Sequence, residues 1–357
     1  MTLKDVAREV GVSAHSVSAV LNGKAEHYRI SPATQQRIEK MALELGYDPD
    51  NNRSARQMAA RKHGVKMLSN VIAVCSNPDS QPVHQQPYVA EFLDGIESVA
   101  DEQGLDVLTC RLRTDRLPRM IEKEEVDGII MLNSKTSQLD TLQSLHLPVV
   151  KLGSCYPGMH SISAEHYEGT RMATACLVES GHRQIAYIGH DTSFDVHDSV
   201  LLEAAQKRFS GFQDVMEKAQ MPVEYYDCTL RESYPEEGVR AFHSLWEQSG
   251  GKITAVVCYN DTIAMGVILA ARQMGLEVPH DLSVVGFDAV SDRYLFEPFI
   301  TSVGYDRVLM GKRAVEILMQ YRQGDNAPAK EERQYIQEVL PVHFVEGATT
   351  APPRKTI

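Results

Sequence analysis

Polar side chains stand directly after several apolar, strand-like runs in the body of the sequence. Asn77 follows VIAVCS, Asp191 comes after IAYIGH, Asn260-Asp261 follows AVVCY and Asp288 follows VVGF. Because ligands of open α/β sheets bind outside the carboxyl ends of the strands, these side chains are candidates for holding a polar small molecule. Asp261 and Asp288 could instead cap the helices that follow them. The residues alone leave both alternatives open.

Motifs of catalysis are absent from the sequence. There is no GxSxG elbow, no GxGxxG after a strand, no GxxxxGK[ST] loop and no HExxH. The thirteen histidines raise the question of a metal site, but His160, His166, His190 and His197 lie in loop-like stretches without convincing partners. We therefore expect no enzyme, no metal site and no cofactor.

A short segment near the amino terminus presents small and hydrogen-bonding side chains between apolar ones. Val17, Val20 and Leu21 are spaced to face a core. Between them stand residues where a surface helix normally shows Lys and Glu: Ala14, His15, Ser16, Ser18 and Ala19. Such side chains let a helix sit deep in the DNA major groove and read base edges. We therefore expect these five residues to be exposed and to face DNA.

Three short helices must position this segment. Thr2 begins a capping-box pattern that opens a helix over about residues 3–10, and Gly11 ends it. Ser13 can cap the second helix and Ser31 a third. Two helices joined by a short glycine turn, with a nearly chargeless second helix, predict a helix-turn-helix module.

Apolar runs separated by amphipathic segments fill the chain from about Val71. The first series reads VIAVCS, LDVLTC, DGIIML and LPVVKLG; the second, after Gly181, reads QIAYIG, VEYYDCT, AVVCY and LSVVGFD. This alternation is typical of βαβ units on a parallel sheet. We predict an α/β body of two lobes, each with a parallel sheet, and a cleft between them.

Size and charge agree with a separate head and body. The 357 residues exceed the ~250–300 at which a single core stops growing, so at least two domains are expected. Residues 1–63 hold ten Lys and Arg against seven Asp and Glu, whereas the whole chain has a net charge of −12. A cationic head suits contact with phosphates, although so small an excess is also ordinary scatter.

The sequence also predicts a cytoplasmic protein without a membrane partner. No apolar run reaches the ~18 residues of a bilayer crossing, and MTLKDVAREV has charges where a signal peptide is apolar. The six cysteines are widely spaced with no CxxC, which favours core-filling thiols in a reducing compartment.

The head resembles that of the LacI/GalR family of bacterial transcription regulators. The resemblance rests on TLKDVAREVGVSAHSVSAVLNGK followed by ISPATQQRIEKMALELGY. It implies that Ala14 and His15 read bases. Positions that contact the phosphate backbone in the family fall on Ser16, Ser18 and Asn22. The family usually has Arg at the position that Ala19 occupies here. An Arg that makes two hydrogen bonds to guanine contributes ~1–3 kcal/mol to discrimination between bases, so the operator should differ from those of better-known relatives.

A hinge helix is implied after the head. The segment 52–59 is marginal as an isolated helix because nucleation is costly, but it could form when two copies pair on DNA. By the resemblance, Met58 takes the place of a leucine that wedges into the minor groove, behind Ala55 and Arg56. Methionine is flexible and apolar enough for that role. The alternative is an unstructured linker.

The body resembles the same family throughout, through GHRQIAYIG, RFSGF, AVVCYND and VPHDLSVVGFD. This implies a periplasmic-binding-protein-like effector domain whose chain crosses between the lobes three times. Effector-holding positions fall on Arg208 and Asp261, and Asp288 lies near the cleft. Tyr88 is the ring most suited to stack on a ligand. Glu165-His166 departs from the family's usual Asp-Asn at the cleft edge.

These observations predict a sequence-specific transcription regulator, a repressor, controlled by a sugar or sugar derivative in the cleft. A nucleobase is the alternative effector, and a solute-binding receptor without a regulatory role is the alternative function. The expected partner is a pseudo-palindromic double-stranded operator bound by a homodimer. A tetramer is not expected, because the ending GATTAPPRKTI has two prolines and no apolar heptads.

The expected boundaries divide the chain into a head (1–50), a hinge and linker (51–66), a two-lobed domain (67–345) and a tail (346–357). The first lobe is expected to take about 67–164 and 292–325. The second is expected to take about 165–291 and 326–345.

Overall fold

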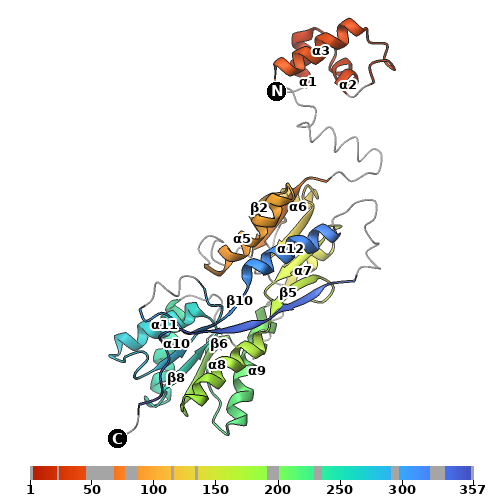
Figure 1. Ribbon diagram of the computed structural model, residues 1–357. Helices are drawn as coiled ribbons and strands as arrows, with labels where there is room; N and C mark the ends of the chain where they lie inside the picture. The colour runs from red at the N-terminus through yellow and green to blue at the C-terminus, as the bar shows by residue number, and fades with distance from the viewer. Residues whose placement is uncertain are drawn as a thin grey trace. The chain divides into compact units, whose positions relative to one another are not determined.

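A computed structural model of the protein describes most of the chain in two compact units, Met1–Leu68 and Ser69–Ile357 (Figure 1). The described residues are 3–21, 24–45, 68–76, 87–113, 116–132, 136–190, 201–228, 235–290, 297–321 and 334–354. Asn22 and the predicted hinge residues Ala55, Arg56 and Met58 lie outside the described residues, so their roles stay predictions.

The first unit contains a bundle of three helices: α1 (Leu3–Val10), α2 (Ala14–Leu21) and α3 (Pro32–Glu44). Apolar side chains from all three form one buried core. Ser13 Oγ accepts a hydrogen bond from Ser16 N at 3.0 Å, and Ser31 Oγ accepts one from Thr34 N at 3.2 Å. Both predicted N-caps are thereby confirmed, because each serine oxygen takes up a backbone donor at its helix start.

A six-stranded parallel sheet forms the first lobe of the second unit. In spatial order its strands are β11 (Gln337–Leu340), β5 (His160–Ala164), β4 (Val149–Leu152), β3 (Gly128–Met131), β1 (Val71–Ser76) and β2 (Asp106–Arg111). One face packs on α5 (Pro87–Glu102) and α12 (Arg307–Tyr321), the other on α6 (Arg119–Glu122) and α7 (Thr136–Gln143). Along β1, Ile72 and Val74 enter the first core and Ala73 and Cys75 the second, as the two-residue period of a strand requires.

The second lobe repeats this plan with four parallel strands. Their order is β7 (Glu224–Cys228), β6 (Ile185–His190), β8 (Ala255–Cys258) and β9 (Ser283–Val285). One face packs on α8 (His166–Glu179) and α9 (Leu201–Lys218), the other on α10 (Pro235–Gln248) and α11 (Asp261–Gln273). The predicted α/β class with two parallel sheets is confirmed.

The chain passes between the lobes three times. It enters the second lobe after β5, leaves it after β10 (Ser302–Tyr305) into α12, and returns from β11 to β12 (Val342–Val345), which pairs antiparallel with β10. The sequence places residues 326–345 in the second lobe, whereas β11 pairs in parallel with β5 of the first sheet. The physical reason is that the edge of β5 offers backbone groups that β11 can pair with.

The last described residues belong to the second lobe and do not form a separate tail. Thr349 has 0% of its surface exposed. Its Oγ1 accepts a hydrogen bond from Thr301 N at 2.9 Å and donates one to Val284 O at 2.6 Å. A buried, fully paired hydroxyl fixes this segment against β9.

Helices α5 and α12 approach each other at a pair of glycines. A Cβ on Gly95 would lie 2.0 Å from the Val308 carbonyl oxygen, and a Cβ on Gly311 would lie 2.2 Å from the Phe92 carbonyl oxygen. Both obstacles are backbone atoms, so rotation of a side chain cannot relieve the clash. The helices can pack at this distance only with glycine at both positions.

We therefore expect Gly95→Ala to lower the free energy of unfolding by about 1–3 kcal/mol, the usual cost of overpacking. Urea denaturation followed by circular dichroism measures it. Ser98→Ala, at an exposed position of the same helix, is the control and should stay within about 0.5 kcal/mol of the wild type. Equal stability of the Gly95 variant and the control would show that α5 and α12 can separate without cost.

Candidate DNA-binding and effector-binding sites

Helix α2 carries most of the residues predicted to contact DNA. Four of them keep exposed surface: Ala14, His15, Ser16 and Ser18. Ala19 is buried, with 5% of its surface exposed, so the expectation that it is exposed is wrong. The chain turns back at the end of α2, where Lys24 N donates to Ala19 O at 2.8 Å. This turn belongs to the tertiary fold, and the helical pattern of α2 alone does not indicate it.

Two rings from the loop after α2 stand beside His15. Tyr28 meets the His15 ring edge to face with centroids 4.7 Å apart, and His27 meets Tyr28 in the same way at 4.9 Å. Tyr28 is 46% exposed. No local pattern singles out these two rings, because only the path of the loop brings them next to α2. They extend the polar and aromatic surface around His15.

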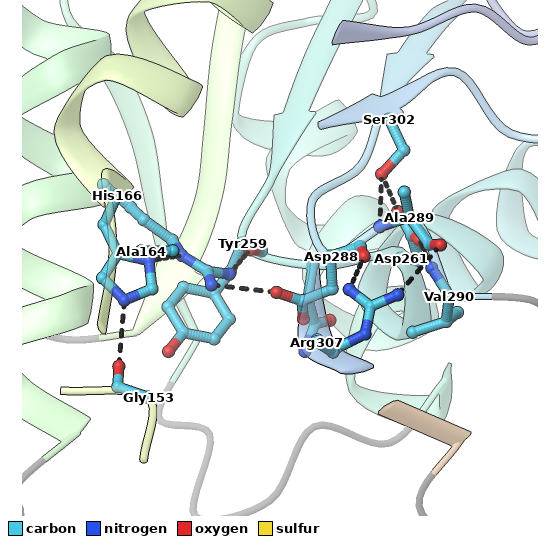
Figure 2. Close-up of polar contacts among 12 residues, drawn as sticks. Gly153, Ala164, His166, Tyr259, Asp261, Asp288, Ala289, Val290, Ser302 and Arg307 are labelled. Carbon is cyan, nitrogen blue, oxygen red and sulfur yellow. Dashed lines mark hydrogen bonds and ion pairs between the residues drawn. The ribbon is translucent and has the colours of Figure 1, made fainter. Parts of the chain in front are cut away.

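The buried guanidinium of Arg208 is the centre of the predicted effector site. Arg208 projects from α9, is 4% exposed, and its Nη2 forms an ion pair with Asp288 Oδ1 at 3.0 Å. Its other nitrogens donate to the Tyr259 carbonyl oxygen and to His166 Nδ1 (Figure 2). Its Cζ lies 3.7 Å from the centre of the Phe287 ring. The structure therefore brings Arg208 and Asp288 together and adds Tyr259, which the sequence pattern does not identify.

His166 links the two lobes in its neutral form. Burial, together with the charge of Arg208, lowers the pKa of His166 to about 3. Because Nδ1 accepts from Arg208, the ring proton must be on Nε2, which donates to Gly153 O at 2.9 Å. His166 lies on α8 and Gly153 follows β4, so this hydrogen bond joins the second lobe to the first (Figure 2). Where the family usually has Asp-Asn, this chain has Glu165-His166, and the His166 imidazole is buried.

Asp288 lies in a strained turn that Arg307 holds. Asp288 has φ 94° and Ala289 φ 47°, left-handed conformations that cost non-glycine residues about 1–3 kcal/mol each. Arg307, at the start of α12, donates to the carbonyl oxygens of both residues (Figure 2). Its Nη2 also forms an ion pair with Glu91 of α5 at 2.7 Å. Arg307, which the sequence pattern does not single out, therefore connects this turn to the first lobe.

Asp261 is occupied by the protein itself. It is 1% exposed, and its two carboxylate oxygens accept hydrogen bonds from Ser302 Oγ at 2.5 Å and Val290 N at 2.8 Å. It makes no hydrogen bond or ion pair with Arg208 in the part of the chain that the structure describes. Asn260 and not Asp261 is the N-cap of α11, accepting from Ile263 N at 3.0 Å. The capping alternative therefore does not describe Asp261, and its predicted role in holding the effector stays a prediction.

Tyr88 lies on α5 and reaches both lobes. Its half-buried ring packs against the core shared by the two lobes and against the core of α10 and α11. It meets Phe92 edge to face with ring centroids 6.2 Å apart. Tyr88 is therefore in a position to respond to a change in the relation between the lobes.

The described residues contain no group of three or more His, Cys, Asp or Glu side chains that could hold a metal ion. Within the same ranges, no helix combines the length and the apolar character that a bilayer crossing requires.

Family models match two parts of the sequence. The model described as bacterial regulatory proteins of the lacI family matches residues 2–50. The model of the periplasmic-binding-protein-like domain matches residues 174–350. The first range contains the whole three-helix head. The second contains Arg208, Tyr259 and Asp288, whereas His166 and Gly153 precede it.

Characterised relatives and solved structures are similar over nearly the whole length. The HTH-type transcriptional repressor PurR of Vibrio parahaemolyticus is 29% identical over 332 residues, which covers 89% of this chain and 91% of the relative. The structure of a lac repressor dimer bound to operator and the anti-inducer ONPF has a TM-score of 0.69 and 26% identity, covering 98% of this chain and 99% of that one. A complex of the transcriptional regulator CelR with cellobiose has a TM-score of 0.67 and 25% identity, with the same coverage.

The buried carboxyl group of Asp261 leads to a prediction about pH. Burial raises the pKa of Asp261 to about 7, whereas the same group titrates near ~3.9 in an unfolded chain. Between these values the folded protein holds a proton that the unfolded chain has lost. The stability from this group is therefore full below about pH 4 and is lost as the pH rises through 7. Asp261→Asn should flatten the dependence of Tm on pH in this window.

Asp261→Ala separates this titration from the hydrogen bonds. It leaves the Ser302 hydroxyl and the Val290 N–H without their acceptor, so the free energy of unfolding should fall by about 1–3 kcal/mol at every pH. Thermal melts of the wild type and both variants across this range give the comparison. If Tm of Asp261→Asn changes with pH as steeply as Tm of the wild type, Asp261 is not the group that titrates in this range.

Proposed function

As a member of the LacI/GalR family of bacterial transcription regulators, this chain is a DNA-binding regulator with an effector-binding body, and we propose that it represses transcription under the control of a sugar or sugar derivative. A homodimer places two heads on the half-sites of a pseudo-palindromic operator. Paired hinge helices bend the centre of that operator, with Met58 as the wedge and Ala55 and Arg56 beside it.

The observation that carries the proposal is the surface of α2. A helix that exposes Ala14, His15, Ser16 and Ser18, with no Lys or Glu among them, fits the major groove and offers hydrogen bonds to base edges and phosphates. A receptor that only carries a solute has no use for such a helix. The head therefore favours the regulator over the solute-binding alternative.

The polar pair in the body supports a carbohydrate effector. Arg208 offers donors and Asp288 an acceptor, so ligand hydroxyls can replace the hydrogen bond that these residues make with each other. Tyr88 offers an apolar ring from the first lobe. Similarity to a regulator whose structure is a complex with cellobiose favours a sugar over a nucleobase. Asp261 acts through its hydrogen bonds to Ser302 and Val290, which support the turn that carries Asp288.

Control runs from the effector site to the first lobe through Arg307. A ligand that separates Arg208 from Asp288 removes one of the contacts that fix the turn at Asp288 and Ala289. Arg307 donates to the carbonyl oxygens of this turn, so its position should change with it. Arg307 passes the change to Glu91 on α5. Coupling of this kind is typically worth ~1–3 kcal/mol and acts equally in both directions between ligand and DNA.

The proposed function is tested by binding-site selection with the full-length protein. His15→Ala should change the preferred operator sequence, because His15 contacts base edges. Asn22→Ala should weaken binding to all sequences about equally, because it contacts the backbone. Selection from a random duplex pool, followed by sequencing, distinguishes the two effects. If His15→Ala selects the wild-type sequence, His15 is not the reading residue; if the wild type selects none, the regulator assignment fails.

Replacing Met58 tests the wedge. Met58→Gly should reduce both operator affinity and operator bending, because no side chain remains to separate the central base step. Effector affinity measured without DNA should stay within about twofold of the wild type, since the coupling between the two sites acts only when DNA is bound. Circular-permutation gels report the bend and calorimetry the effector affinity. Wild-type bending by Met58→Gly would exclude Met58 as the wedge.

A further inference from the structure

A lysine is completely buried in the first lobe. Lys151 lies on β4, is 2% exposed, and stands in an otherwise apolar strand. Its Nζ turns to the carboxyl end of the sheet and donates to Leu132 O at 2.7 Å and to Leu152 O. An ammonium group has three N–H donors, so hydrogen bonds to these two carbonyl oxygens leave the third donor available.

No ion pair joins Lys151 to a carboxylate in the ranges of the chain that the structure describes. The carboxylate of Glu203 in the first turn of α9 is already engaged, since it accepts from Cys155 N at 2.7 Å and pairs with Lys207 at 2.5 Å. Buried charges in proteins are normally paired, and an unpaired one is costly. Burial lowers the pKa of Lys151 to about 7, and the charge of Glu203 offsets this only in part.

Two buried serines lie close to Lys151 in the sheet or along the chain. Ser161 is the in-register neighbour of Lys151 on β5, so both side chains leave the sheet on one face. Ser154 follows β4 by two residues. Among the described residues their Oγ atoms have no hydrogen-bond partner, although the residues are 0% and 1% exposed. Unpaired buried hydroxyls are rare in folded proteins, so these two, near a buried ammonium, are candidates for holding a ligand.

This group of side chains adjoins the site that contains Arg208. Gly153 lies between Leu152 and Ser154, and its carbonyl oxygen accepts from His166, which also accepts from Arg208. The charge of Lys151 is close enough to contribute to the lowered pKa of His166. One molecule can therefore contact Lys151 from the first lobe and Arg208 from the second.

We propose that Lys151 is the anchor for a negatively charged group of the effector, a carboxylate or a phosphate, with Ser154 and Ser161 donating to the same oxygens. The inference rests on the proposed function and makes its effector a sugar acid or a sugar phosphate. A neutral polyol cannot offset a desolvated ammonium, whereas an anion both pairs with it and accepts from the hydroxyls. Because Lys151 is closed off from solvent here, the anion enters when the lobes separate.

The test compares anions on the full-length protein and its Lys151→Met variant, in which a side chain of similar length lacks the charge. The probes are inorganic phosphate, glucose 6-phosphate and gluconate, against glucose and against chloride at equal ionic strength. Lys218→Met, at an exposed position of α9, is the control for loss of one positive charge. Calorimetry and thermal shift measure affinity, and the chloride series removes general salt effects.

Wild type and Lys218→Met should bind at least one anion at least about tenfold more tightly than Lys151→Met, the usual scale for a lost hydrogen bond to a charged group. Tight binding of glucose 6-phosphate and phosphate identifies a phosphate group, and tight binding of gluconate a carboxylate. Anion binding at pH 8 should also take up close to one proton in the wild type and none in Lys151→Met, because the anion favours the charged ammonium. Heats measured in buffers of different ionisation enthalpy give this number.

One result would overturn the proposal: no anion binds the wild type more tightly than it binds Lys151→Met. Lys151 would then only tether the carbonyl oxygens at the ends of β3 and β4. Operator binding without added anion is measured on the same samples. Its absence in the wild type would refute the proposed function, whereas operator binding without a Lys151-dependent anion effect would refute only the anionic effector. Lys151→Gln, a polar replacement, provides the same comparison if Lys151→Met fails to fold.

Discussion

The arrangement of the body depends on the burial of one guanidinium group. Arg208 carries a permanent charge and is almost completely shielded from solvent, so the N–H groups of its guanidinium need acceptors from the protein. The acceptors come from α8, from the end of β8 and from the turn after β9. These elements are far apart in the sequence, and the need to satisfy one side chain fixes their relative positions. Removing one partner of such a buried pair typically costs ~3–5 kcal/mol.

The same constraint explains why a strained turn persists. Asp288 must present its carboxylate to Arg208 while its carbonyl oxygen faces Arg307, and the left-handed backbone at Asp288 and Ala289 meets both requirements. Arg307 then joins this turn to Glu91 of the first lobe. Two arginines therefore hold this strained turn, one through the carboxylate of Asp288 and one through its carbonyl oxygen. Such a turn is suited to switching, because a ligand that replaces the first contact allows the strained backbone to relax and the second contact to shift.

Burial also sets the charge of the groups around this site. The pKa of His166 is lowered to about 3, that of Lys151 to about 7, and that of Asp261 is raised to about 7. In each case desolvation disfavours the charged form. Among the described residues of this polar region, the ion pairs are Arg208–Asp288 and Arg307–Glu91. A ligand that brings its own charge would meet groups whose protonation can adjust to it.

The sequence by itself determined the helices of the head with their serine caps and the two parallel sheets, because each follows from local spacing. It also matched Arg208 to an effector-holding position of the family through a shared motif. The tertiary structure decided what local patterns cannot carry. Ala19 is buried once the head has folded, Asp261 is occupied because Ser302 and Val290 approach from another strand and turn, and β11 joins the first sheet because β5 has a free edge. Lys151 is one charged residue in an apolar strand, and only the packed lobe shows that it is buried and pairs with no carboxylate among the described residues. Burial and pairing are properties of the assembled neighbourhood, and residues distant in sequence supply that neighbourhood.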